Sequence, residues 1–115
     1  MPASNETVVL VTRRGMGHGD PELQLELFRK YLKLLAGNGT LPGAICFYTD
    51  GVRLVVEGSP VLEDLRAVER AGTHLIVCQT CLIHYGLTDS LRVGIVGGMG
   101  DIVAAQAKAA KVISI

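Results

Sequence analysis

The sequence predicts an α/β fold in which a mostly parallel β-sheet is covered by helices on both faces. Two observations predict this class. Short β-branched and aliphatic runs, typical of buried strands, alternate with amphipathic segments of helical length. Glycine-rich turns separate these segments, and helices of this length serve as crossovers between parallel strands. The 115 residues suffice for a modest hydrophobic core, so we expect a single domain over residues 1–115.

The first strand and the start of the first helix are read from local signals. Residues 7–11 form a β-branched apolar run, and the glycine-rich loop at residues 15–19 follows it. Asp20 is the expected N-cap of a helix, because Pro21 after it suits the first helical position.

The first helix is predicted over residues 22–36, where apolar residues recur at intervals of three and four positions. We expect its buried face to include Leu23, Leu27 and Leu34. Gly37-Asn38-Gly39 should end the helix.

The middle of the chain predicts a second strand at residues 44–48, left by the turn Asp50-Gly51. Cys46 lies within this strand and is expected to pack in the core. Residues 52–57 fit both a short strand and a helical turn. A second helix should follow through residue 70, with Ser59 as its N-cap and Gly72 after its end.

The last part of the chain continues the alternation. A third strand is predicted at residues 74–78, a short helix at 80–85 and a fourth strand within 91–96. An alanine-rich helix at residues 102–109 and a last strand at 111–115 complete the pattern.

Composition excludes several classes of partner and location. Eleven basic residues balance eleven acidic ones and are scattered, so neither nucleic acid nor an anionic membrane surface is an expected partner. The first twenty residues lack the pattern of a secretory signal, and no apolar run approaches the roughly 20 residues of a membrane span. The three cysteines are therefore expected in the reducing cytoplasm, where a CxxC motif serves redox, sulfur or metal chemistry.

The expected chemistry centres on Cys78 and Cys81, which directly follow the third strand. Ligands of parallel sheets gather at the carboxyl ends of the strands, where the next helix begins with free N–H groups. A helix start and nearby cations lower the pKa of a thiol, and only the thiolate attacks sulfur or binds metal. We therefore predict Cys78 and Cys81 as catalytic residues, although a strand-end cysteine can also serve as a small hydrophobic residue.

Four further residues are candidate binding residues around the thiols. His18 and Arg13, in the loop after the first strand, could reach the same edge, as could Arg14, and a positive charge there would stabilise a thiolate or an anionic sulfur species. His84 lies one helical turn beyond Cys81.

Gly17 and Gly98 are predicted binding positions because they lie in glycine-rich loops that follow strands. The spacing of the first loop does not match GxGxxG, and tight turns explain both loops equally. The second loop precedes a helix whose N-terminus could bind an anion.

Three alternatives to a sulfur-handling protein remain open. A thioredoxin-like dithiol oxidoreductase also uses CxxC at a helix start, but Gln79-Thr80 between the cysteines contains no proline. A zinc site needs about four ligands, which the one CxxC and dispersed histidines do not supply within a subunit, so we predict no metal and no cofactor. A noncatalytic module for ligand binding or assembly is the third alternative.

Several short motifs resemble the DsrE/DsrF-like family over nearly the whole chain, in particular the C-terminal DsrE-like domain of YedF-type proteins. The motifs are Gly17-His18-Gly19-Asp20, Glu22-Leu23, Gly51-Val52-Arg53-Leu54, Glu57-Gly58-Ser59-Pro60-Val61-Leu62-Glu63-Asp64-Leu65, Cys78-Gln79-Thr80-Cys81-Leu82 and Tyr85-Gly86-Leu87.

The resemblance implies a three-layer α/β/α sandwich with a five-stranded sheet, assembly as a homotrimer or hexamer, and transport of sulfur as a cysteine persulfide. In the sulfur-relay subunit TusD the persulfide cysteine stands eight residues before a glycine, as Cys78 does before Gly86. Cys81 matches the second YedF-type cysteine and could either resolve a persulfide as a disulfide or only pack against its neighbours. YedF proteins also carry a TusA-like domain, which makes a TusA-like protein one candidate sulfur donor or acceptor, and the identity of both is left open. Whether the carrier handles sulfur or selenium is left open.

Overall fold

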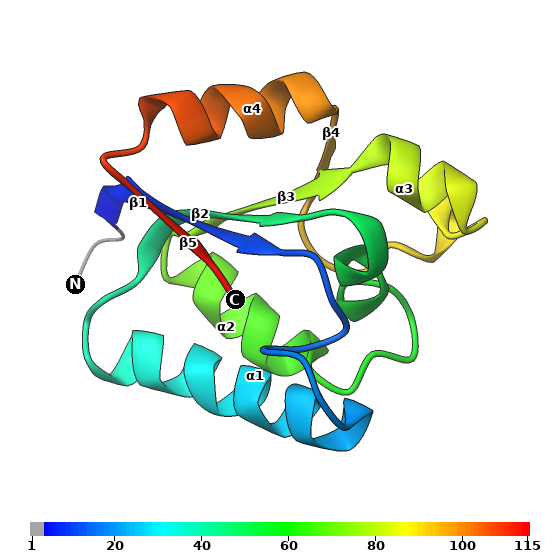
Figure 1. Ribbon diagram of the computed structural model, residues 1–115, viewed down its shortest axis with the longest axis horizontal. Coiled ribbons are helices and arrows are strands. Elements are labelled where there is room, and N and C mark those ends of the chain that lie inside the picture. The colour runs from blue at the N-terminus through cyan, green and yellow to red at the C-terminus, as the bar shows by residue number, and fades with distance from the viewer. Residues whose placement is uncertain (1–3) are drawn as a thin grey trace.

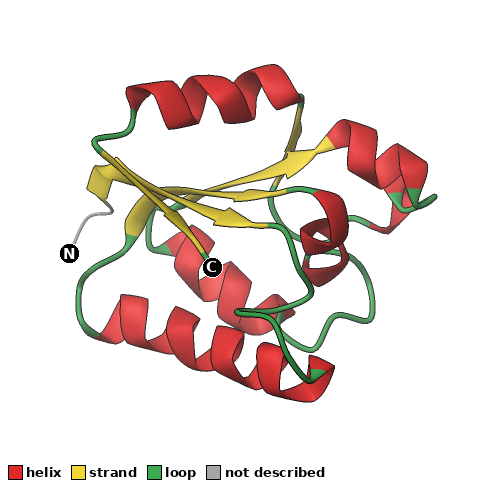
Figure 2. Cartoon of the chain, in the orientation of Figure 1, coloured by secondary structure: helices red, strands yellow, loops and turns green. Residues whose placement is uncertain are grey.

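The computed structural model describes residues 4–115, which form one five-stranded sheet in the order β4-β3-β2-β1-β5 with every pairing parallel (Figures 1 and 2). The strands are β1 (Ser4–Val11), β2 (Pro42–Phe47), β3 (His74–Cys78), β4 (Ile95–Gly97) and β5 (Lys111–Ser114). The helices are α1 (Pro21–Gly37), α2 (Leu62–Arg70), α3 (Gln79–His84) and α4 (Met99–Lys108), with the 3-10 turns η1 (Thr49–Leu54) and η2 (Thr88–Ser90).

The layers follow from the direction in which the chain crosses the sheet. From β1 to β3 the chain advances strand by strand in one direction, and it returns from β4 to β5 across the whole sheet. Because crossovers between parallel strands are right-handed, helices of the two directions lie on opposite faces. Figure 1 shows α1 and α2 below the sheet and α4 above it. The predicted α/β class and the five-stranded sheet are confirmed, and the sheet is wholly parallel.

The core lies along the central strands, as expected for a parallel sheet covered on both faces. Every residue of β2 is buried, including Cys46, whose predicted core position is confirmed. Phe28 and Leu32 of α1 and Leu65 of α2 cover one face, while α4 buries Ile102. This packing fixes the carboxyl ends of β1, β2 and β3 at one edge.

The predicted buried face of the first helix is wrong. Leu23, Leu27 and Leu34 are 50%, 42% and 59% exposed, whereas Phe28 and Leu32 are fully buried. At 3.6 residues per turn, the three leucines lie roughly 100–140° around the helix from Phe28. The helix has apolar residues in two stripes, and periodicity alone does not say which stripe meets the sheet.

The second helix also begins later than predicted. Its N-cap is Val61, not Ser59, and α2 starts at Leu62. The Ser59 hydroxyl accepts a hydrogen bond from the Val61 N–H at 3.3 Å. Ser59 therefore stabilises a local turn before the helix, a role that serine also favours.

The fourth strand is shorter than the predicted segment. Leu91 forms an isolated antiparallel bridge with Val56, and β4 begins only at Ile95. Gly94 separates the two, with φ of 89°. A left-handed glycine bends the chain here and allows β4 to pair with β3.

Residues 52–57, for which the sequence fits both a short strand and a helical turn, combine the two: the 3-10 turn η1 ends at Leu54, and Val56 forms an isolated bridge with Leu91. The expected start of the domain at residue 1, and part of the expected absence of a secretory signal, lie in residues 1–3 outside the described residues. Within residues 4–115, no helix is long and apolar enough to cross a membrane.

Replacement of Gly51 should destabilise the fold, because η1 packs directly against the end of β1. A Cβ atom on Gly51 would clash with the carbonyl oxygen of Val11. Gly51→Ala is expected to lower the free energy of unfolding by about 2–3 kcal/mol, measured by urea denaturation. Gly19→Ala is the matched control, because Gly19 has open space around it and no left-handed φ. Equal unfolding midpoints for the two variants would contradict this packing.

Candidate functional site

The two cysteines of the CxxC motif meet at the carboxyl end of β3. Cys78 is the last residue of β3 and the N-cap of α3, and its extended backbone turns directly into the helix. Cys81 lies in the first turn of α3, close enough to interact with the Cys78 thiol. Cys78 is fully buried, whereas Cys81 is partly exposed. Solvent therefore reaches the pair on the Cys81 side.

Strand register brings two other connections beside the thiols. Gly97 pairs with Cys78 across the β3–β4 ladder, so the loop that starts α4 lies next to Cys78. Phe47 pairs with Val77 on the other side, so η1 begins next to α3. The site is thus built from the ends of three adjacent strands, as expected for a parallel sheet.

Thr49 of η1 holds the Cys81 sulfur. Its backbone N–H donates a hydrogen bond to Cys81 Sγ at 3.1 Å. Thr49 has φ of 48°, a left-handed conformation that is unfavourable for a β-branched residue. Its hydroxyl lies 2.9 Å from the carbonyl oxygen of Thr12 and 2.7 Å from that of Tyr48. These contacts hold the strained residue with its N–H directed at the thiol.

A polar network forms the outer rim of the site. The Tyr85 hydroxyl donates a hydrogen bond to Asp50 Oδ1 at 2.8 Å, and Arg53 Nε lies 3.6 Å from the same oxygen. The Arg53 guanidinium stacks over the Tyr85 ring, 4.2 Å from its centroid. His84 packs edge-on against Tyr85, with ring centroids 5.1 Å apart. The rim thus joins η1 to the end of α3.

Sequence reasoning did not single out Thr49, Asp50, Arg53 and Tyr85 as site residues. Two signals could have found them. Thr49, Asp50 and Arg53 follow directly after β2, at the same edge as the end of β3. Tyr85 lies four residues after Cys81, one helical turn away.

Burial and the neighbouring thiol control the protonation of Cys81. Burial raises its pKa above the ordinary value, the Thr49 N–H opposes that rise, and hydrogen bonding and charge repulsion with Cys78 add to it. At neutral pH Cys81 is therefore mainly a neutral thiol, contrary to the lowered pKa expected of a cysteine at a helix start. With only six residues, α3 has few aligned peptide dipoles to offset burial.

The pKa values of Tyr85 on the rim and of Cys46 in the core are also raised. The hydrogen bond to Asp50 raises the pKa of Tyr85, together with burial and the Asp50 charge, while Arg53 opposes the rise. Tyr85 thus stays a neutral hydrogen-bond donor at neutral pH. Burial also raises the pKa of Cys46, to about 11, which makes it an unreactive core thiol.

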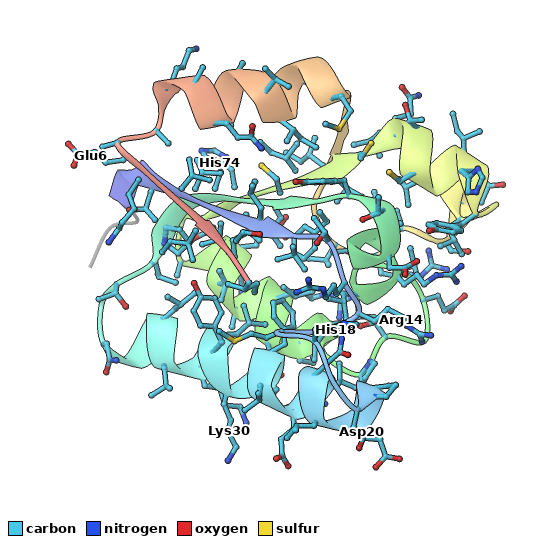
Figure 3. The ribbon with its side chains drawn as sticks, viewed as in Figure 1. Glu6, Arg14, His18, Asp20, Lys30 and His74 are labelled. Carbon is cyan, nitrogen blue, oxygen red and sulfur yellow. The ribbon has the colours of Figure 1, made fainter. Side chains whose placement is uncertain are left out.

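The structure places the other predicted binding residues in different surroundings. His84 lies on the rim through its contact with Tyr85. Arg13 Nη1 instead lies 3.4 Å from the carbonyl oxygen of Gly17 and 3.5 Å from that of Ile115. The Arg13 side chain therefore points toward β5, on the other side of the sheet order from β3. His18 is exposed on the α1 side of the sheet (Figure 3). Arg13, Gly17 and His18 are therefore not grouped with the thiols.

Gly98 lies near Cys78 but its N–H is already occupied. It donates a hydrogen bond to Asp101 Oδ2 at 2.9 Å. The Asp101 carboxylate thus satisfies the N-terminus of α4, the point where an anion was expected. No three His, Cys, Asp or Glu side chains in the described part of the chain are grouped so as to hold a metal ion.

The fold and the site define a three-layer α/β protein with a pair of interacting thiols at the carboxyl edge of a parallel sheet. The model of the DsrE/DsrF-like family matches residues 9–115, and the chain belongs to this family. The family is associated with sulfur relay. The match is to the family as a whole, so the YedF type within it stays a prediction. No curated protein matches the chain.

Solved structures share this fold at low sequence identity. The chain is similar to the protein of unknown function MTH1491 from Methanobacterium thermoautotrophicum, with a TM-score of 0.72, 20% identity and coverage of 95% of this chain and 97% of that one. It is also similar to the ychN protein from E. coli, with a TM-score of 0.69, 21% identity and full coverage of both chains. The conserved protein of unknown function BT1422 from Bacteroides thetaiotaomicron has a TM-score of 0.67 at 16% identity over 96% of each chain.

The reactivity of Cys81 should rise at higher pH than that of an ordinary thiol, because its pKa is raised. Iodoacetamide labelling followed by peptide mass spectrometry measures its rate against pH. We expect a midpoint above that of the same cysteine in urea-unfolded protein. In Cys78→Ala the midpoint should move down, since the interactions with the second thiol are removed. A midpoint at or below the unfolded value would refute this description of the site.

Proposed function

We propose that the protein is a sulfurtransferase-like sulfur carrier that holds sulfane sulfur as a persulfide on Cys78. The observation that carries the proposal is the pairing of a fully buried thiol, Cys78, with a partly exposed one, Cys81, at the carboxyl edge of the sheet. Membership of a family associated with sulfur relay supports it.

The chemistry of loading conserves sulfur and electrons. The Cys78 thiolate attacks the outer sulfur of a donor R–S–SH, a new S–S bond forms, and R–S⁻ leaves and takes up a proton. A partner thiolate then attacks the outer sulfur of Cys78–S–SH and carries it away, which returns Cys78 to the thiolate. Alternatively, the Cys81 thiolate attacks Cys78 Sγ and releases sulfide, leaving a Cys78–Cys81 disulfide.

The burial of Cys78 gives the carrier a means of protecting its cargo. α3 buries Leu82, whereas Gln79, Thr80, Ile83 and His84 are exposed. A six-residue helix that buries only one side chain, Leu82, belongs to the low-stability part of a fold. Its local opening costs little free energy. In the proposal, opening of α3 exposes Cys78 for loading, and closure shields the persulfide from other thiols.

The proposal extends to location and partners. A persulfide carrier with free cysteines suits the reducing cytoplasm, and a TusA-like protein is the proposed donor or acceptor. Exposed apolar side chains on β4 and α4 support assembly into a homotrimer or hexamer, because such patches are typical of interfaces. They are Ile95, Val96, Met99 and Val103.

A dithiol oxidoreductase is the second candidate, favoured by the direct interaction of the two thiols. It would cycle between the dithiol and the Cys78–Cys81 disulfide and would need both cysteines for every turnover. A sulfur carrier needs only Cys78 for loading. Cysteine variants therefore separate the two functions.

Reduced protein incubated with inorganic polysulfide should gain one sulfur atom on Cys78, seen by intact mass spectrometry and peptide mapping. Cys78→Ser should lose this adduct, because the accepting thiolate is gone. Cys81→Ser should keep the adduct and fail to form the internal disulfide, and Cys46→Ser is the matched control with unchanged loading. Dependence of loading on both Cys78 and Cys81 would favour the oxidoreductase, and an adduct that survives in Cys78→Ser would reject Cys78 as the carrier.

A further inference from the structure

Three leucines form an exposed stripe along the outer side of α1. Leu23, Leu27 and Leu34 are exposed, whereas the opposite side of the helix buries Phe28 and Leu32 against the sheet. At 3.6 residues per turn the three leucines lie within about 40° of one another around the helix axis, over a length of about 16 Å. Single exposed leucines are ordinary on a protein surface, but an aligned stripe is typical of a helix that packs against another element.

The spacing of the stripe is that of a coiled-coil seam. In a heptad abcdefg, the residues at positions a and d face the partner helix. Leu27 and Leu34 take successive a positions, and Leu23 takes the first d position. The second d position is Lys30, which points away from the sheet on the outer side of α1 (Figure 3). A single polar residue in such a seam specifies the register and oligomer state at a cost in stability.

Exposed charges follow one flank of this α1 seam in a definite order. The first half of α1 carries acidic residues and the second half basic ones, namely Glu22 and Glu26 followed by Lys30 and Lys33. The helix dipole does not account for this order, because only Glu22 lies in the first turn and the last turn contains no basic residue. An antiparallel copy of α1 would place its basic half against this acidic half, whereas a parallel copy would place like charges together.

We propose that two copies of the protein form a two-fold symmetric dimer in which their α1 helices pack antiparallel along the α1 seam. In this register Leu23 of one copy lies opposite Leu34 of the other, and Glu26 lies opposite Lys30 and Lys33. Each contact occurs twice, as a two-fold interface requires. A single helix pair is at the small end of specific interfaces, so we expect a dissociation constant on the order of 10 μM.

The dimer is separate from the assembly proposed for β4 and α4, because α1 and α4 cover opposite faces of the sheet (Figure 1). It also leaves the thiol sites free. α1 follows β1 and therefore begins at the carboxyl edge of the sheet, where the cysteines lie. Antiparallel packing of two α1 helices thus places the two thiol sites at opposite ends of the dimer, each accessible to its own donor or acceptor.

The apolar part of the seam is tested by analytical ultracentrifugation at about 100 μM protein, roughly ten times the expected constant. Leu27→Asp should halve the particle mass and raise the dissociation constant at least about tenfold, because it places a charge near the centre of the contact. Ile83→Asp is the matched control, since Ile83 is an exposed apolar residue of α3. Both positions are exposed, and circular dichroism checks that the fold is kept. An unchanged mass in Leu27→Asp, or an equal loss in Ile83→Asp, would overturn the dimer.

The charges are tested by mixing two variants. Glu26→Lys makes this part of the flank wholly basic, and the double variant Lys30→Glu/Lys33→Glu makes it wholly acidic. Each variant alone should fail to dimerise because like charges face each other, and an equimolar mixture should form a mixed dimer that weakens with added salt. Absence of the mixed dimer would overturn the antiparallel register.

The dimer and the sulfur-carrier function can fail independently. Loading of Cys78 by polysulfide should be the same in Leu27→Asp and in the unchanged protein. Dimerisation without any loading would reject the carrier function and uphold the α1 seam, and loading without dimerisation would do the reverse.

Discussion

The hydrogen bond from the Thr49 N–H to the Cys81 sulfur is the contact on which the thiol site depends. It joins η1, which follows β2, to α3, which follows β3, and the rim contacts of Tyr85 with Asp50 and Arg53 join the same two elements. Thr49 adopts a left-handed backbone that directs its N–H at the sulfur, and Gly51, two residues later, lets η1 lie against the end of β1. The close approach of Gly51 to Val11 and the hydrogen bond from Thr49 thus position the Cys81 sulfur together.

The two cysteines of the site are three residues apart and differ in their exposure to solvent. Cys78 ends an interior strand of the sheet and is buried, whereas Cys81 belongs to a short helix and is partly exposed. Its raised pKa keeps Cys81 mainly protonated, so it does not attack a persulfide on Cys78 at neutral pH as readily as an ordinary cysteine would. In the proposed function, a slow resolving thiol would let the sulfur on Cys78 survive until the acceptor arrives. Arg53 stacks on Tyr85 and lies beside Asp50, so it closes the rim over the end of α3.

Local patterns in the sequence predicted the sheet and the position of the CxxC motif, since β-branched runs mark strands and parallel strands present their carboxyl ends together. β3 is observed at residues 74–78, as predicted. The buried face of α1 could not be chosen locally, because two apolar stripes compete and only the sheet decides between Phe28 and Leu27. The rim could not be predicted from the sequence either, because Asp50 and Tyr85 are 35 residues apart and meet only in the folded chain. The raised pKa of Cys81 likewise reflects burial, which the sequence does not reveal.

The most direct measurement is a crystal structure of the protein after treatment with polysulfide, with the sulfur atoms located by anomalous scattering. The account predicts one additional sulfur peak about 2.05 Å from Cys78 Sγ, with α3 displaced to make room for it. A peak bonded to Cys81 or Cys46, or no additional peak in crystals of protein whose mass shows the adduct at full occupancy, would contradict the claim that Cys78 carries the sulfur.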